Sequence, residues 1–158
     1  MELIKNAKVL YKNREYRDFR ELLNITADLF GEKDAFIIKH KKSRKEFTYE
    51  KVSFNRFRED VNSLGTGLME AGHRGKRIAI IGKNRYEWIL SYFAAVCGLG
   101  VCIPLDKGLP YEELESSLAR SYADILIFDR DHKTDVEKII AEGKTNVTTF
   151  ISMDETEG

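Results

Sequence analysis

The nearest candidate for a nucleotide phosphate site is one short segment, Gly82-Lys83-Asn84. The segment follows an apolar run and opens a helix-like stretch. Backbone N–H groups at the start of a helix, together with a lysine, are the donors that phosphate oxygens accept. Known phosphate-binding loops contain several glycines at fixed spacings, and this segment contains one. We therefore interpret residues 82–84 as a simple turn between a strand and a helix.

The three histidines do not form a catalytic pattern. His40, His73 and His132 are far apart in the sequence and fall in predicted loops or helix ends. None has a spacing to a nucleophile that would single it out as a general base. We expect all three at the surface.

The cysteines and a run of acidic residues also have structural explanations. Cys97 and Cys102 are the only cysteines, and they lie on predicted apolar faces with no histidine nearby, so buried free thiols are favoured over a metal site or a disulfide. Acidic side chains begin the predicted helix after Pro110, where negative charge stabilises the helix dipole. These are Glu112, Glu113 and Glu115.

Apolar runs rich in β-branched residues provide the elements that would position these side chains. They alternate with helix-like segments, which is the pattern of parallel βαβ units. The predicted strands are Ile78–Ile81, Val101–Leu105, Ile125–Phe128 and a last one near Val147–Ile151. We predict a three-layer α/β fold with a mostly parallel sheet and helices on both faces. By analogy with doubly wound sheets, we expect the strand order 2-1-3-4.

A helix and a hairpin are expected before the sheet. Apolar residues at helical spacing predict an amphipathic helix from Tyr16 to Phe30, stopped by Gly31. The strands Ala35–His40 and Glu46–Val52 bracket the basic run KHKKSRK, which predicts a β-hairpin with a charged tip. Such a run could meet a phosphate, an acidic partner or a membrane surface, but most runs of this length are solvated, and we interpret it so.

The remaining helices are predicted to cover the sheet. Ser53 is the predicted N-cap of a helix that ends at Gly72 and has one apolar stripe, as a helix packed on a sheet requires. Gly65 and Gly67 lower its helix propensity and suggest close approach to a neighbour. The helix after the first strand contains Trp88, expected to be largely buried. Later helices are predicted from Pro110 to about Tyr122 and through Val136, Ile139 and Ile140.

Composition favours one globular domain of 158 residues, with 42% hydrophobic and 33% charged residues. The 26 Lys and Arg balance the 26 Asp and Glu, so no overall field would attract nucleic acid, and we expect no nucleic-acid partner. The stretch Trp88–Leu105 has no charged residue, but Gly98, Gly100 and Pro104 interrupt it, which argues against a transmembrane span. The N-terminus shows no signal-peptide pattern, so a cytoplasmic location is expected.

The central residues also carry a family resemblance. A strand followed by NRYEW, a buried helix, Gly100-Val101, Pro104-Leu105, an acidic helix and ARSYADILIF resembles the early region of AMP-forming acyl-CoA ligases, which belong to the adenylate-forming superfamily. The NRYEW form most resembles the long-chain fatty acid branch. The similarity extends from Phe54 to Phe128 and covers only the early part of a typical member.

The resemblance implies an enzyme that forms an acyl adenylate from a carboxylate and ATP and then transfers the acyl group to coenzyme A. The family neutralises the phosphate charge with a Ser/Thr/Gly-rich loop, Mg²⁺ and a C-terminal lysine. All these elements would lie downstream, and this chain lacks them. We therefore assign no catalytic, cofactor-binding or metal-binding residue. The positions that match the family's early signature are interpreted as scaffold: Asn84, Glu87, Trp88, Gly100 and Pro104.

We predict one α/β domain over residues 1–158, the N-terminal part of the large domain of such a ligase. It would comprise a helix and hairpin (1–53), a βα core (54–152) and a frayed or cut acidic end (153–158). The full enzyme would act on a fatty acid or other carboxylate with ATP, Mg²⁺ and coenzyme A, and this chain alone would be inactive. The alternatives are a self-standing, non-catalytic α/β interaction module and a small flavodoxin-like nucleotide or flavin binder, for which residues 82–85 serve poorly.

Overall fold

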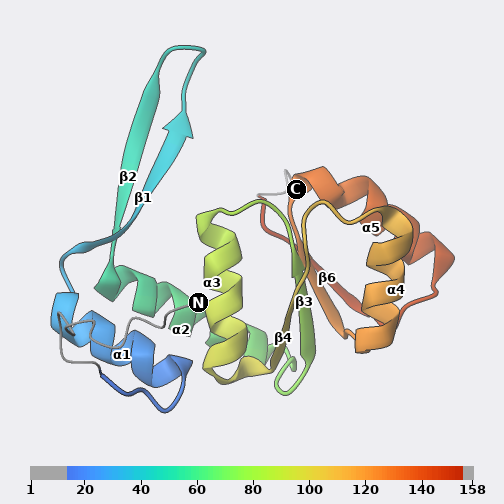
Figure 1. Cartoon of the computed structure of the whole chain (residues 1–158), viewed down its shortest axis with the longest axis horizontal. Coiled ribbons are helices and arrows are strands. Elements are labelled where there is room, and N and C mark those ends of the chain that lie inside the picture. The colour runs from blue at the N-terminus through green and yellow to red at the C-terminus, as the bar shows by residue number, and fades with distance from the viewer. Residues whose placement is uncertain (1–13, 155–158) are drawn as a thin grey trace, which may run out of the picture.

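The computed structural model describes residues 14–154, which form a central parallel sheet and a separate hairpin (Figure 1). The sheet contains β3 (Arg77–Ile81), β4 (Val101–Pro104), β5 (Ile125–Phe128) and β6 (Thr149–Ser152). Its order is β4-β3-β5-β6, and all three pairings are parallel. Numbered along the chain, this is the order 2-1-3-4, so the predicted sheet and its strand order are confirmed.

The inner strands are continuous apolar runs because helices cover both of their faces. In β3, Ile78 pairs with Cys102 of β4 on one side and with Ile125 of β5 on the other. Residues 78–81 and 125–127 are all buried. The alternation of side chains along each strand divides these residues between two separate cores.

The first core lies between the sheet and two helices, α4 (Tyr111–Ser121) and α5 (Lys133–Glu142), which Figure 1 shows together on one face. Both helices direct leucine, valine or isoleucine side chains at the strands. The buried members of this core are Ala79, Ile81, Leu114, Leu118, Ala123, Leu126, Val136 and Ile139. Ile140, predicted to join this helix's apolar face, is exposed instead.

The second core lies on the opposite face, beneath α2 (Phe54–Glu70), α3 (Tyr86–Ala94) and a π-helical turn, Ala95–Leu99. Its buried members are Ile78, Ile80, Ala95, Leu99, Ile125 and Ile127. Helices on both faces of a parallel sheet make three layers, as predicted.

A third core joins the N-terminal elements to this framework. The helix α1 (Phe19–Phe30), the hairpin strands β1 (Asp34–Lys41) and β2 (Phe47–Ser53), α2 and α3 surround it. Its buried members are Leu23, Val52, Phe57 and Val61. The hairpin is packed at its base only, and most of its length extends away from the domain (Figure 1).

Two helix starts follow standard capping rules. The Asp18 carboxylate accepts a hydrogen bond from the Glu21 backbone N–H at 2.8 Å and begins α1, so Tyr16 lies before the helix. The Ser53 hydroxyl accepts from the Arg56 N–H at 3.2 Å and begins α2, which confirms the predicted N-cap.

The predicted close approach at two glycines of α2 is wrong. A Cβ atom placed on Gly65 or Gly67 would have no heavy atom within 4 Å. The close approach occurs instead at Gly100, where a Cβ would lie 2.0 Å from the Lys76 carbonyl oxygen. Glycine at position 100 therefore lets the start of β4 pass the segment that leads into β3.

Trp88 is less buried than predicted. Its side chain is half-buried at the border of the second core and stacks on Tyr92, with 5.7 Å between ring centroids and 9° between planes. Tyr92 in turn packs edge-on against Phe19 and Phe93, with 6.0 Å between ring centroids in each pair.

The predicted frayed end lies partly outside the described residues, which stop at Asp154. Within them, the Met153 N–H donates to the Phe128 carbonyl at 2.8 Å and Asp154 contacts two arginines, so these two residues are not frayed. The uncharged stretch Trp88–Leu105 forms α3, the π-helical turn and β4. No helix within the described part of the chain is long and apolar enough to cross a bilayer.

Candidate functional site

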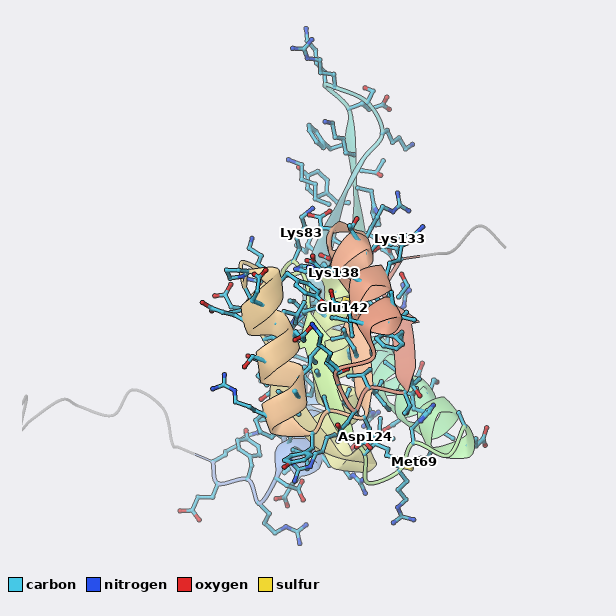
Figure 2. The ribbon with its side chains drawn as sticks, turned by 90° about the vertical axis from the view of Figure 1, so that its right-hand side faces the viewer. Met69, Lys83, Asp124, Lys133, Lys138 and Glu142 are labelled. Atoms are coloured by element: carbon cyan, nitrogen blue, oxygen red, sulfur yellow. The ribbon has the colours of Figure 1, made fainter. Side chains whose placement is uncertain are left out.

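The carboxyl ends of β3 and β5 meet where parallel α/β sheets commonly bind ligands. After β3 the chain crosses to form β4 on one side of it, and it then crosses back to form β5 on the other side. The connections therefore run in opposite directions on either side of the point between β3 and β5. Ligands of such folds bind in the crevice outside that switch point. Figure 2 shows Lys83 at this end of the sheet and Asp124 at the opposite end.

Polar residues after β3, β5 and β6 form a cluster at this edge, which we call the carboxyl-edge cluster. Its members are Lys83, Arg85, Asp129, His132 and Asp154. Each comes directly after a strand or within the short turn that follows it. The strands therefore set the spacing of the cluster, and the turns direct its side chains toward one another.

Asp129 is the centre of the cluster and is only 2% exposed. One carboxylate oxygen accepts a hydrogen bond from the Lys83 backbone N–H at 2.8 Å. The other lies 2.6 Å from His132 Nδ1, and His132 Nε2 lies 3.1 Å from the Lys107 carbonyl oxygen. The imidazole thus connects the end of β5 to the loop that precedes α4.

The buried position of His132 corrects the sequence prediction, which placed all three histidines at the surface. His132 is 7% exposed, because its ring fills the space between Asp129 and Lys107. His40 is exposed and contacts Glu50 at 3.0 Å, as expected for a surface histidine, and His73 is half-buried. The three rings come from different parts of the fold and do not form a common site.

Burial opposes ionisation of Asp129, but its partners outweigh that effect. The Lys83 N–H and the His132 ring both favour the carboxylate form, so the pKa of Asp129 is lowered from its ordinary value. Gly82 permits this contact, since its φ of +154° suits glycine and a Cβ there would lie 3.0 Å from the Asp129 carboxyl carbon.

A second carboxylate, Asp154, joins the remaining turns. It accepts hydrogen bonds from Arg85 Nη1 at 2.7 Å and from the Arg130 backbone N–H at 2.6 Å. Arg85 also contacts Glu87 at 2.5 Å. The hydrogen bond from the Arg85 guanidinium lowers the pKa of Asp154. Partial burial raises this pKa, and the hydrogen bond from the Arg130 N–H lowers it further, so the pKa lies below its ordinary value.

These contacts leave the edge unsuited to a phosphate group. The Lys83 N–H, which a phosphate would need, is already bound to a buried carboxylate, and the Lys83 side chain pairs with Asp131 at 2.5 Å. A phosphate here would meet the negative charges of Asp129 and Asp131. The residues present therefore do not fit a phosphate group, and the structure supports a simple turn at 82–84.

A pocket of about 390 Å³ lies beside the cluster, lined by Lys83, Lys107, Asp131, His132 and Asp135 among others. It contains no serine, cysteine or threonine that could act as a nucleophile. Across residues 14–154, no group of three His, Cys, Asp or Glu side chains could hold a metal ion.

The cysteines are free, as predicted, but less buried than predicted. Cys97 and Cys102 are free and half-buried, and burial raises the pKa of the Cys102 thiol to about 11 and that of Cys97 in the same direction. A raised thiol pKa lowers the fraction of thiolate, the form that binds metals and acts as a nucleophile. Glu112 and Glu113 lie exposed in the first turn of α4, and Glu115 accepts a hydrogen bond from the Tyr111 hydroxyl at 3.1 Å.

Comparison with known proteins identifies the family of this chain. A family model described as AMP-binding enzyme matches residues 25–157. The chain belongs to the AMP-binding enzyme family. The match includes α2, the whole sheet and the carboxyl-edge cluster, and is wider than the span of 54–128 that the sequence motifs suggested.

Curated relatives of this chain are named as acyl-CoA ligases. The mitochondrial medium-chain acyl-CoA ligase ACSF2 of Mus musculus is 27% identical over 115 residues, which are 72% of this chain and 18% of that protein. Fatty acyl-CoA synthetase A of Dictyostelium discoideum is 30% identical over 107 residues, or 67% of this chain and 16% of that protein. The chain thus matches less than one fifth of the length of these relatives.

A solved structure confirms the fold of this family member. The long-chain-fatty-acid-CoA ligase FadD1 of Archaeoglobus fulgidus superposes with a TM-score of 0.77 at 21% identity, over 96% of this chain and 30% of that one. The sheet and helices described above therefore form a fold that this solved structure shares.

Sequence reasoning missed the cluster, although one signal was available. Asp129, Asp131 and His132 follow directly after a buried strand, and polar side chains at the carboxyl end of a parallel strand are placed at the ligand-binding edge of the sheet. The hydrogen bond between the Lys83 N–H and Asp129 could not be predicted from the sequence, because the two residues are 46 positions apart.

Proposed function

We propose that this chain is the N-terminal subdomain of an ATP-dependent, AMP-forming fatty acid CoA ligase, and that it is inactive alone. The family match over residues 25–157 carries the proposal, since it covers nearly all of the described fold. Function in such folds depends on particular groups placed on the scaffold. Here the groups at the carboxyl edge bind one another, which supports a scaffold role.

The proposed substrate class is a fatty acid, activated as an acyl adenylate and then transferred to coenzyme A. The curated relatives named above act, by their names, on medium-chain or fatty acyl groups. The first step requires neutralisation of phosphate charge, and ATP and Mg²⁺ would supply the leaving group and the countercharge. None of the carboxyl-edge residues is free to take part, so we propose that other segments of the enzyme perform these steps.

The gene offers a direct test. Its coding sequence beyond Gly158 should contain a Ser/Thr/Gly-rich phosphate loop, and the protein that includes it should release pyrophosphate only when ATP, Mg²⁺ and a fatty acid are all present. A series of fatty acids of increasing length would then show the preferred substrate. The 158-residue chain, assayed in parallel, should release none.

Other results would reject the proposal. If the coding sequence stops at Gly158, or continues without such a loop, a non-catalytic interaction module becomes the better explanation. Turnover by the 158-residue chain itself would show that a catalytic site has been overlooked. Activity of the longer protein with a non-fatty carboxylate, but with no fatty acid, would keep the ligase and reject the substrate class.

A further inference from the structure

The hairpin has one buried face and one exposed face. Cross-strand partners lie on the same face, and successive residues alternate between faces. Phe36 and Ile38 face the third core, where the Phe36 ring lies 4.9 Å from that of Phe57. The opposite face consists of three cross-strand pairs: Ile37 with Lys51, Lys39 with Tyr49, and Lys41 with Phe47.

This outward face combines lysines with exposed apolar side chains. Ile37 is 61% exposed, Tyr49 is 63% exposed and Phe47 is 39% exposed. The Lys39 ammonium lies over the Phe47 ring, 3.8 Å from its centroid. A face made only for contact with water would not need three large apolar side chains side by side, whereas an interaction surface would.

The tip adds a strong local charge to this face. Residues 39–45 contain five Lys or Arg and no Asp or Glu, although the whole chain is neutral. Lys41, Lys42, Arg44 and Lys45 are exposed, and no ion pair within residues 14–154 involves them. One acidic residue, Glu46, also lies exposed in the turn at the tip and leaves the positive charge in excess there. The other two lie lower down, where Asp34 pairs with Lys51 and Glu50 pairs with Arg56.

The shape of the molecule makes this charge accessible. Both views show the hairpin extending well beyond the rest of the domain, with the tip furthest from the sheet (Figures 1 and 2). A flat surface could therefore contact the tip without meeting the helices. Lower on the hairpin, Ile37 and Lys39 line a pocket that is shared with the start of α3.

We propose that the β1–β2 hairpin binds the surface of an anionic lipid bilayer. The tip cations would contact the lipid phosphates and carboxylates, and Ile37, Tyr49 and Phe47 would enter the boundary between headgroups and acyl chains while the neighbouring lysine stems extend to the headgroups. This interaction is separate from the proposed ligase activity and requires no nucleotide site.

A bilayer fits this surface better than other polyanions. Proteins that bind single-stranded nucleic acid use a basic groove that follows the backbone, and the hairpin is a protruding element whose exposed apolar residues include the aliphatic Ile37. An acidic protein segment would match the charge of the tip but would leave Ile37 and Tyr49 without an apolar partner. The combination of cations with interfacial apolar residues is typical of membrane-surface elements.

Vesicle co-sedimentation of the 158-residue chain tests the proposal. We expect binding to vesicles of phosphatidylcholine with phosphatidylserine, little binding to phosphatidylcholine alone, and weaker binding as salt rises above about 0.1 M. Each Lys or Arg near such a surface contributes about fivefold to the partition coefficient. The combined variant Lys42→Gln, Arg44→Gln and Lys45→Gln should therefore bind about a hundredfold more weakly.

The matched control changes the same residue types elsewhere. Arg120→Gln, Lys133→Gln and Lys138→Gln alter net charge equally on α4 and α5, and binding should change by less than about threefold. A second variant, Ile37→Ser with Tyr49→Ser, keeps every charge and should bind about tenfold more weakly. Circular dichroism confirms that each variant is folded, which is expected because all of these side chains are at the surface or half-buried.

Several outcomes would overturn the proposal. They are absence of binding to serine-containing vesicles, equal loss in the tip variant and its control, and unchanged binding when Ile37 and Tyr49 are replaced. Tighter binding of single-stranded RNA or poly-glutamate than of vesicles at the same salt would identify a different polyanion as the partner.

Discussion

Asp129 is a charged residue that the fold buries, and its partners make that burial tolerable. Its carboxylate accepts from the Lys83 N–H and contacts the His132 ring, so the two turns after β3 and β5 depend on one side chain. An unpaired buried donor costs roughly 1–3 kcal/mol, and a broken buried pair costs more. The residue is therefore important for stability.

Removal of this carboxylate should be costly. We expect Asp129→Ala to lower the free energy of unfolding in urea by about 3 kcal/mol, because the Lys83 N–H and the His132 ring lose their acceptor. The control Asp131→Ala breaks an exposed pair with Lys83 and should change it by less than about 0.5 kcal/mol. Equal effects of the two changes would show that the buried contacts do not stabilise the edge.

The contribution of Asp129 to the free energy of unfolding should also depend on pH. Its pKa is lowered by folding, so the folded state binds fewer protons than the unfolded state and Asp129 stabilises fully above the unfolded pKa of about 4. As the pH falls through the lower folded pKa, this contribution is lost. The gap between wild type and Asp129→Asn should thus be constant from about pH 7 to 5 and shrink below about pH 4. A gap that grows in acid would contradict the assignment.

At the scale of elements, Gly100 and Gly67 should respond to substitution in opposite ways, because only Gly100 is closely packed. Gly100 begins β4 against the Lys76 carbonyl, and a Cβ there would lie 2.0 Å from that oxygen, so Gly100→Ala should destabilise the protein by about 3 kcal/mol. Gly67 lies in α2 with open space around it, so Gly67→Ala should stabilise by about 0.5 to 1 kcal/mol. Urea unfolding of both variants checks the opposite signs, and a loss of stability in both would reject this explanation.

The elements were predictable where local residues decide them. The strand runs, the Ser53 cap and the hairpin follow from periodicity and capping chemistry, and the structure confirms them. The role of Gly65 and Gly67 was predicted wrongly because a glycine in a helix has two explanations, low propensity and close packing, and only the neighbours distinguish them. The neighbours of Gly100 were equally unreadable, since Lys76 precedes β3, on the far side of α3 in the sequence.

For the whole molecule, the arrangement of strands was easier to predict than the chemistry at their ends. Parallel βαβ units allow few orders, so the order β4-β3-β5-β6 could be expected from the alternation of runs and helices. The burial of His132 could not, because it depends on Lys107 and Asp129 approaching from different connections. The extension of the hairpin away from the domain could not be predicted either. Its alternating sequence shows which residues share a face, but it does not show how much of the hairpin packs against the domain.

The most direct test of the central claim is a calorimetric titration of the folded 158-residue chain with Mg·ATP. The carboxyl edge satisfies its own donors, so we predict a cooperative urea unfolding transition together with no saturable heat of ATP binding. Saturable binding with a Kd in the micromolar range would contradict this prediction. It would show that the turn at residues 82–84 opens from Asp129 to accept a phosphate.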